Sequence, residues 1–295
     1  MLHLAVFYVE FAVRGVVISW KSLKTVKFST VVLKHEEIGK LLSDCPTLET
    51  LELSCFYVFR HLEINNSNLK RLKLKDSWPA YEEGDHTLEI AAPYLQHLEI
   101  SGDIDDVKSR LVNVSSLVSV ELIFDITCVQ DLQLEKFVSF VDYAFGKLFY
   151  TCSSLRTLAL SNCAFDRGVV ISWKSLKTVK FSTVVFKHEE IGKLLSDCPT
   201  LETLELSCFY AFRHLEIKNS NLKRIKLKDS WPAYEEGDHT LEIAAPYLQH
   251  LEISGDIDDV KSRLVNVSSL VSVELIFEIT CVSNLQDHFV YVIET

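Results

Sequence analysis

Three cationic side chains at alternating positions are the residues of this chain best suited to bind a ligand. They are Arg71, Lys73 and Lys75, and they recur as Arg224, Lys226 and Lys228. Alternate residues of a β-strand point to the same face of its sheet, so each set would form a basic stripe on one exposed strand. Guanidinium and ammonium groups in such a stripe can bind anionic or strongly polar groups of another molecule.

Aromatic and imidazole side chains are expected close to each stripe. Trp78 and Tyr81 lie just past the basic strand, and His97 and Glu99 lie on the next strand. The matching residues of the second set are Trp231, Tyr234, His250 and Glu252. Trp, Tyr and Arg supply much of the binding energy at protein interfaces, so these residues form a candidate protein-binding site. In an alternative interpretation, which we prefer for the two tryptophans, they cover the end of the hydrophobic core.

The spacings of common catalytic and metal sites are absent from the sequence. His35-Glu36-Glu37 lacks the second histidine that a zinc-protease helix requires. The carboxylates between Asp103 and Asp106 lack the glycine and terminal glutamate of a calcium loop. Neither a glycine-rich phosphate loop nor a G-x-S-x-G motif occurs. We therefore predict that the chain is not an enzyme and binds no metal or cofactor.

The elements that position these residues follow a short repeat, L-x-x-L-x-L, in which Val, Ile or Phe can replace Leu. In the second half of the chain the repeat recurs every 21 to 26 residues, beginning at Leu155, Leu176, Leu201, Leu222, Leu248 and Leu270. In the first half it begins at Leu23, Leu48, Leu69, Leu95 and Leu117. This spacing predicts an α/β leucine-rich-repeat solenoid, a ribonuclease-inhibitor-like horseshoe with a parallel concave sheet and an irregular or helical convex side.

Other local patterns agree with this fold class. Residues 34–46 and 187–199 predict one convex helix per half, because apolar residues lie three and four positions apart and a proline follows. A partial strand is expected near Leu4, and a helix is favoured over a strand for the apolar residues between Leu134 and Phe145.

The central outward position of the predicted strands carries a ladder of charges. Its members are Lys27, Glu52, Lys73, Glu99 and Glu121, then Lys180, Glu205, Lys226, Glu252 and Glu274. Neighbouring strands lie about 4.8 Å apart, so these side chains stand side by side. For most of the ladder we favour mutual neutralisation over ligand recognition, because exposed ion pairs contribute little to stability.

A long internal duplication organises the chain. Residues 14–129 recur almost unchanged as residues 167–282, and Asn65/Lys218 is the one exchange that conserves neither size nor charge. We therefore divide the chain into residues 1–129, the first copy with a truncated start; 130–166, a connecting insertion with one repeat; 167–282, the second copy; and 283–295, a C-terminal tail. We expect both copies to share one continuous sheet, with residues 130–152 as a convex connection.

Composition restricts the environment and the partners. A net charge of −11 disfavours nucleic-acid binding, which needs clustered cations. The N-terminal apolar stretch contains Glu10 and is too short to span a bilayer, so neither a secretory signal nor a membrane anchor is expected. The eight cysteines contain no C-x-x-C pair and are interpreted as buried thiols in a reducing compartment, which predicts a cytoplasmic or nuclear protein.

Four blocks of sequence resemble the leucine-rich region of plant F-box/LRR proteins, of the type that often ends in an FBD domain. The blocks are SWKSLKTVKFSTV, EEIGKLLSDCPTLETLELSCF, AAPYLQHLEISG and RLVNVSSLVSVEL, and each occurs twice. The resemblance implies a module that presents a target to a Skp–cullin–F-box ubiquitin ligase. Only thirteen residues precede the first copy, so an F-box is not expected here, nor is binding of the Skp adaptor.

The sequence is consistent with three functions. The leading hypothesis is a module that binds an unknown protein target through its exposed strands. In the alternative, the near-identical copies belong to a vestigial or structural fragment of a duplicated F-box/LRR gene, without a selected partner. A third reading, a receptor ectodomain, is disfavoured because the sequence shows no signal peptide.

Overall fold

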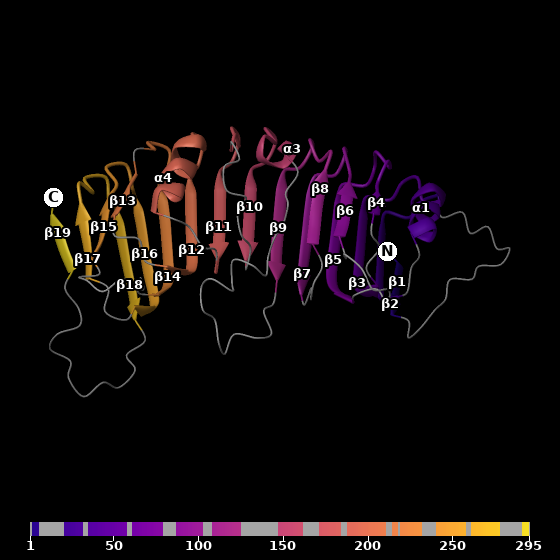
Figure 1. Cartoon of the computed structure of the whole chain (residues 1–295), viewed down its shortest axis with the longest axis horizontal. Helices are drawn as coiled ribbons and strands as arrows, with labels where there is room; N and C mark the ends of the chain where they lie inside the picture. The colour runs from indigo at the N-terminus through magenta and orange to yellow at the C-terminus, as the bar shows by residue number, and fades with distance from the viewer. Residues whose placement is uncertain are drawn as a thin grey trace, which may run out of the picture. The chain divides into compact units, whose positions relative to one another are not determined.

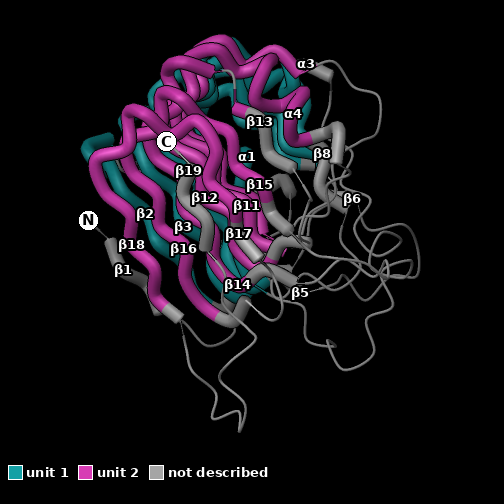
Figure 2. Tube along the Cα trace, turned by 90° about the vertical axis from the view of Figure 1, so that its left-hand side faces the viewer, with its two compact units in different colours: residues 1–155, 162–170 teal, residues 156–161, 171–295 magenta. Residues whose placement is uncertain are grey.

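The structure is a computed structural model built mainly from short parallel strands (Figure 1). It forms two compact units, residues 1–155 with 162–170 and residues 156–161 with 171–295 (Figure 2). Each unit is described by itself below. The described residues are 2–5, 21–31, 35–57, 61–78, 87–102, 108–124, 147–161, 171–183, 188–210, 214–217, 219–231, 240–257, 261–277 and 291–294.

Unit 1 contains a larger and a smaller parallel sheet. Neighbouring strands of the larger sheet are, in order, β1 (Leu2–Ala5), β2 (Thr25–Val31), β3 (Thr50–Tyr57), β5 (Arg71–Trp78), β7 (His97–Gly102) and β9 (Ser119–Phe124). The smaller sheet consists of β4 (His61–Glu63), β6 (Thr87–Ala91) and β8 (Lys108–Val112). The described part of this unit includes the helices α1 (His35–Asp44), which contacts β4, and α3 (Lys147–Tyr150), which contacts β8.

Unit 2 has the same construction. Its larger sheet consists of β10 (Thr157–Ser161), β11 (Thr178–Ser182), β12 (Thr203–Tyr210), β14 (Arg224–Trp231), β16 (His250–Ile257) and β18 (Ser272–Phe277). Its smaller sheet consists of β13 (His214–Glu216), β15 (Thr240–Ala244), β17 (Lys261–Val265) and β19 (Tyr291–Glu294). The helix α4 (His188–Asp197) contacts β13.

The repeat pattern determines which residues form the core. In β7 buried and partly exposed residues alternate along the whole strand, as expected when one face of a strand points inward. Most leucines that open the repeats, such as Leu48, Leu69 and Leu95, are also buried. The smaller sheet adds Leu62 and Ile90 to the core. The repeats of unit 1 that have a strand in each sheet therefore bury apolar side chains from both strands.

Main-chain hydrogen bonds fix the register between successive repeats. Just before most strands of the larger sheets, one carbonyl accepts hydrogen bonds from two consecutive amides of the next repeat. The Lys24 carbonyl accepts from Glu49 and Thr50 at 2.8 and 3.0 Å, and the Glu49 carbonyl accepts from Lys70 and Arg71 at 2.9 and 3.0 Å. Because the same arrangement recurs at each step, residues at equivalent positions of successive repeats lie directly side by side.

A row of left-handed residues crosses several strands near their ends. In unit 1 the row contains Cys55 (φ 50°), Asp76 (φ 50°) and Gly102 (φ 101°), and in unit 2 it contains Thr183, Cys208, Asp229 and Gly255. Positive φ bends a strand without ending it. The strands β5 and β14 therefore continue to Trp78 and Trp231, whereas the sequence analysis placed these tryptophans past the strand ends.

The last strand of the larger sheet in unit 2, β18, exposes residues that are buried in the identical sequence of unit 1. Val273 and Leu275 are 39% and 41% exposed, whereas Val120 and Leu122 are 0% and 1% exposed. In unit 1 this repeat is followed by residues 147–155, of which Cys152 places its Sγ 3.5 Å from the Leu117 carbonyl oxygen. Unit 2 instead adds β19, which pairs with β17 of the smaller sheet.

Most of the predicted fold is confirmed. The chain is a leucine-rich-repeat solenoid with parallel strands, β1 lies where a partial strand was expected, and α1 and α4 lie within the predicted helical ranges. The smaller sheets were not predicted. The helix predicted between Leu134 and Phe145 lies outside the described residues, and the continuous sheet across residues 130–152 stays a prediction.

Candidate functional site

Three rows of side chains cover the exposed face of the larger sheet in unit 1. The first row is Thr25, Thr50, Arg71, His97 and Ser119. The central row is Lys27, Glu52, Lys73, Glu99 and Glu121. The third row is Ser29, Ser54, Lys75, Ser101 and Ile123. We call this surface the strand face of unit 1.

Ion pairs neutralise most of the central row. Lys27 Nζ lies 2.5 Å from Glu52 Oε2, and Lys73 Nζ lies 2.5 Å from Glu99 Oε1. Both pairs are partly exposed, so each contributes less than about 1 kcal/mol to stability. These contacts confirm the expected mutual neutralisation for four of the five residues, while Glu121 stands opposite Glu99, a residue of its own charge.

Two cations of β5 remain available at the surface. Arg71 and Lys75 are exposed, and among the described residues of unit 1 no ion pair involves Arg71. Lys75 makes only a long contact, with its Nζ 3.9 Å from Oδ2 of the adjacent Asp76. The strand face therefore presents two uncommitted cations on either side of the neutralised Lys73.

His97 adds a neutral polar group beside Arg71. The two residues are register partners on β5 and β7. Burial lowers the pKa of His97 from its ordinary value of 6.5, and the nearby Arg71 guanidinium lowers it further. The imidazole is therefore neutral at pH 7 and can both donate and accept a hydrogen bond.

The strand face of unit 2 repeats this arrangement. Lys180 pairs with Glu205 at 2.9 Å and Lys226 pairs with Glu252 at 2.6 Å. The hydrogen bond from Lys226 to Glu252 raises the pKa of that lysine. The exposed cations are Arg224 and Lys228, and Lys228 lies 3.9 Å from Asp229. In this unit His250 Nδ1 lies 2.8 Å from Ser272 Oγ.

The structure brings together most of the candidate binding residues. Each strand face collects the three cations with the following histidine and glutamate, which are ten of the fourteen residues proposed from the sequence. Trp78 and Trp231 end the basic strands, at the register positions of Tyr57 and Tyr210. Tyr81 and Tyr234 lie outside the described residues.

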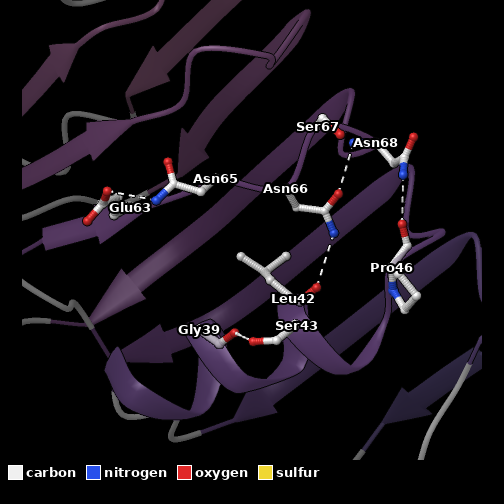
Figure 3. Close-up of a pocket in the computed structure, with 9 residues that line it drawn as sticks. All are labelled: Gly39, Leu42, Ser43, Pro46, Glu63, Asn65, Asn66, Ser67 and Asn68. Atoms are coloured by element: carbon white, nitrogen blue, oxygen red, sulfur yellow. Dashed lines mark hydrogen bonds between the residues drawn. The ribbon is translucent and has the colours of Figure 1, made fainter.

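A polar pocket beside α1 was missed by the sequence analysis (Figure 3). It has a volume of about 540 Å³ and lies between α1 and the turn at residues 63–68. Asn66 Nδ2 donates to the Leu42 carbonyl oxygen at 3.1 Å, and Asn68 Nδ2 donates to the Pro46 carbonyl oxygen at 2.8 Å. These bonds satisfy carbonyls at and after the end of the helix, so the asparagines are structural.

One signal in the sequence pointed toward this pocket. Asn65, which donates to Glu63 Oε1 at 2.8 Å, lines the pocket and is the residue replaced by Lys218 in the second copy. The single non-conservative difference between the copies therefore falls at the pocket.

Over the part of the chain that the structure describes, no three His, Cys, Asp or Glu side chains cluster in a way that could bind a metal ion. Five cysteines in that part have free thiols: Cys45, Cys55, Cys152, Cys198 and Cys208. None of the described helices is long and apolar enough to cross a membrane.

Repeated parallel strands with a buried leucine face and an exposed polar face define a leucine-rich-repeat protein. The family model described as "FBD-associated F-box protein At5g56370, LRR repeats" matches residues 1–123 and again residues 122–276. The chain therefore belongs to this family of repeats, which confirms the resemblance drawn from its sequence blocks.

Curated relatives from Arabidopsis thaliana agree with this assignment. The chain is 30% identical over 129 residues to "Putative F-box/LRR-repeat protein At5g02930", covering 42% of this chain and 27% of that protein. It is 31% identical over 108 residues to "F-box protein At5g03100", covering 36% and 32%. It is 28% identical over 85 residues to "F-box/LRR-repeat protein 25", covering 28% and 33%. The matches thus span about a quarter to a third of each relative, and no solved structure matches the chain.

Proposed function

We propose that the chain is a protein-binding module that holds a target on its two strand faces. The observation that carries this proposal is that β5 and β14 each have one cation in a short ion pair and two cations without one. Lys73 and Lys226 are held in short ion pairs, whereas Arg71, Lys75, Arg224 and Lys228 are exposed without such a pair among the described residues. Exposed arginine beside hydrogen-bonding neighbours is well suited to bind a protein partner.

The family supports a proposed role in ubiquitin transfer. The relatives carry F-box in their printed names, and residues 1–276 match the repeat part of the family model. We therefore propose that this chain supplies the target-recognition part of a Skp–cullin–F-box ubiquitin ligase and that these repeats do not bind the Skp adaptor. In this role the chain needs no catalytic residue or cofactor of its own.

Affinity purification from plant extract tests the proposal. One variant replaces Arg71, Lys75, Arg224 and Lys228 with serine, and a matched control replaces the exposed Lys21, Lys40, Lys174 and Lys193, which removes the same four charges. We expect a protein that is retained by the wild-type chain and the control but lost from the strand-face variant.

Equal recovery with all three chains would contradict a role of the strand faces. Recovery of no specific protein would favour the vestigial fragment, for which the near identity of the two copies is the supporting observation.

A further inference from the structure

We propose that each strand face binds an acidic peptide segment, extended along β5 in unit 1 and along β14 in unit 2. Acidic side chains of the peptide would contact Arg71 and Lys75 in unit 1 and Arg224 and Lys228 in unit 2. This inference rests on the protein-binding function proposed above and names the chemical class of the ligand.

The first step is the charge that remains on β5 once its own ion pairs are counted. The strand carries three outward-facing cations, and Lys73 is neutralised by Glu99 at 2.5 Å. Arg71 and Lys75 keep their positive charges facing solvent, since the contact between Lys75 and Asp76 is 3.9 Å long. An anionic group of a partner would complete both contacts, and opposite charge across an interface favours binding.

The second step is the composition of the rows in which these cations lie. The register neighbours of Arg71 are Thr50 and His97, and those of Lys75 are Ser54 and Ser101. All four are neutral hydrogen-bonding groups, since burial lowers the pKa of His97. No carboxylate occupies the first or third row of the strand face in unit 1. An incoming carboxylate therefore finds hydrogen-bond donors there and no acid in its own row.

The third step is the distance between the two cations. Lys75 lies four positions after Arg71 along the strand, which corresponds to about 13 Å at about 3.3 Å per residue. An extended peptide has the same rise, so its residues four positions apart match the two cations. The residue midway between them would face the Lys73–Glu99 ion pair, which offers no unpaired cation to a third acid. The preferred ligand therefore has acidic residues at positions j and j+4 and a neutral residue at j+2.

The same geometry disfavours a nucleic acid as the ligand. A phosphate backbone would bring a continuous line of negative charge across the central row, where Lys27 and Lys73 are already paired with carboxylates and Glu121 stands beside Glu99. A peptide can avoid these carboxylates because its acidic residues are separated by neutral ones.

Because the proposed site occurs twice, the number of peptides bound per chain tests the inference. Titration calorimetry of the full chain at low salt would use a peptide containing Asp-Ser-Ser-Ser-Asp, with Asn-Ser-Ser-Ser-Asn as the matched neutral peptide. We expect two acidic peptides bound per wild-type chain and at least about tenfold weaker binding of the neutral peptide, because charge-assisted hydrogen bonds are lost. Replacing Arg71 and Lys75 with glutamine should leave one site, and replacing Arg224 and Lys228 as well should leave none.

The control variant replaces Lys21 and Lys40 with glutamine and should retain two sites, and the far-UV circular dichroism of all variants should match wild type because the changed residues are exposed. Equal affinity for the acidic and neutral peptides, or two sites in the Arg71/Lys75 variant, would overturn the inference. Tighter binding of a single-stranded oligonucleotide at the same residues would also overturn it. If the acidic peptide fails while a plant protein is still captured through the strand faces, this inference falls and the proposed function stands.

Discussion

Replacement of Gly102 by alanine tests the row of left-handed residues that bends the strands. Gly102 ends β7 with φ 101°, a backbone conformation that residues with a side chain rarely adopt. A Cβ atom at this position would lie 2.0 Å from Asp76 Oδ1 and 2.8 Å from the Asp76 backbone nitrogen. The Asp76 carboxylate can rotate away, but its backbone is held in β5 between two other strands. Gly102→Ala therefore combines backbone strain with a close contact.

The structure gives the size of the effect. Strain of an unfavourable φ costs about 1–3 kcal/mol, and overpacking adds about 1–3 kcal/mol, so we expect a loss of about 2–6 kcal/mol in the free energy of unfolding. Gly255 occupies the same position in unit 2, where a Cβ would lie 1.8 Å from Asp229 Oδ1. Gly255→Ala should therefore cause a similar loss.

Urea unfolding followed by far-UV circular dichroism measures this loss. The matched control is Gly39→Ala in α1, because no atom lies within 4 Å of a Cβ built there. Alanine is a better helix former than glycine, so the control should stabilise the protein by about 0.5–1 kcal/mol. The two substitutions are chemically identical but should shift the midpoint in opposite directions. An unchanged midpoint for Gly102→Ala, or a shift to higher urea, would refute the reasoning.

Three further predictions concern the core, the helix end and a buried thiol. Leu53→Ala should lower the free energy of unfolding by about 2–5 kcal/mol, because the side chain is fully buried. The control Lys27→Ala removes a partly exposed ion pair and should lower it by less than about 1 kcal/mol. Similar urea midpoints for the two variants would contradict this prediction. Asn66→Ala leaves the Leu42 carbonyl without its donor and should cost about 1–3 kcal/mol, whereas Asn65→Ala, which removes only a bond to exposed Glu63, should change the urea midpoint little. Burial raises the pKa of Cys198 from 9.0 to about 12, so the folded state holds this proton more tightly than the unfolded state. Stability from this thiol is complete below pH 9 and is lost as the pH rises towards 12, and iodoacetamide should label Cys198 only after unfolding; rapid labelling of the folded protein would contradict it.

The residues that repeat regularly were predictable from the sequence. Leucine spacing identified the strands, and alternation placed Arg71, Lys73 and Lys75 on one face, because the side-chain period of a strand is two residues. Lys73 and Glu99 were also aligned correctly, because each lies four positions after the leucine that opens its repeat. These features depend on local strand geometry and on the stacking of similar repeats, and the repeat pattern in the sequence predicts both.

Other features depend on contacts between segments that share no sequence pattern. The strands β4, β6 and β8 have only three to five residues, too few for alternation to distinguish them from loops. Left-handed φ at Cys55 and Asp76 has no sequence signal, because neither residue type requires it. The role of Asn66 at the end of α1 depends on the turn that brings it there.

The exposed strand β18, which ends the larger sheet of unit 2, gives this protein an internal reference for the effect of tertiary environment. Residues 114–124 and 267–277 have the same sequence, so their intrinsic strand propensities and their unfolded chains are the same. Only their surroundings differ, as the exposure of Val273 and the burial of Val120 show. Peptides that extend to Asp125 and Glu278 differ in mass by one methylene group and can be separated in a hydrogen-exchange experiment. The ratio of their exchange rates measures, inside a single molecule, how much the residues that cover a strand protect it from hydrogen exchange.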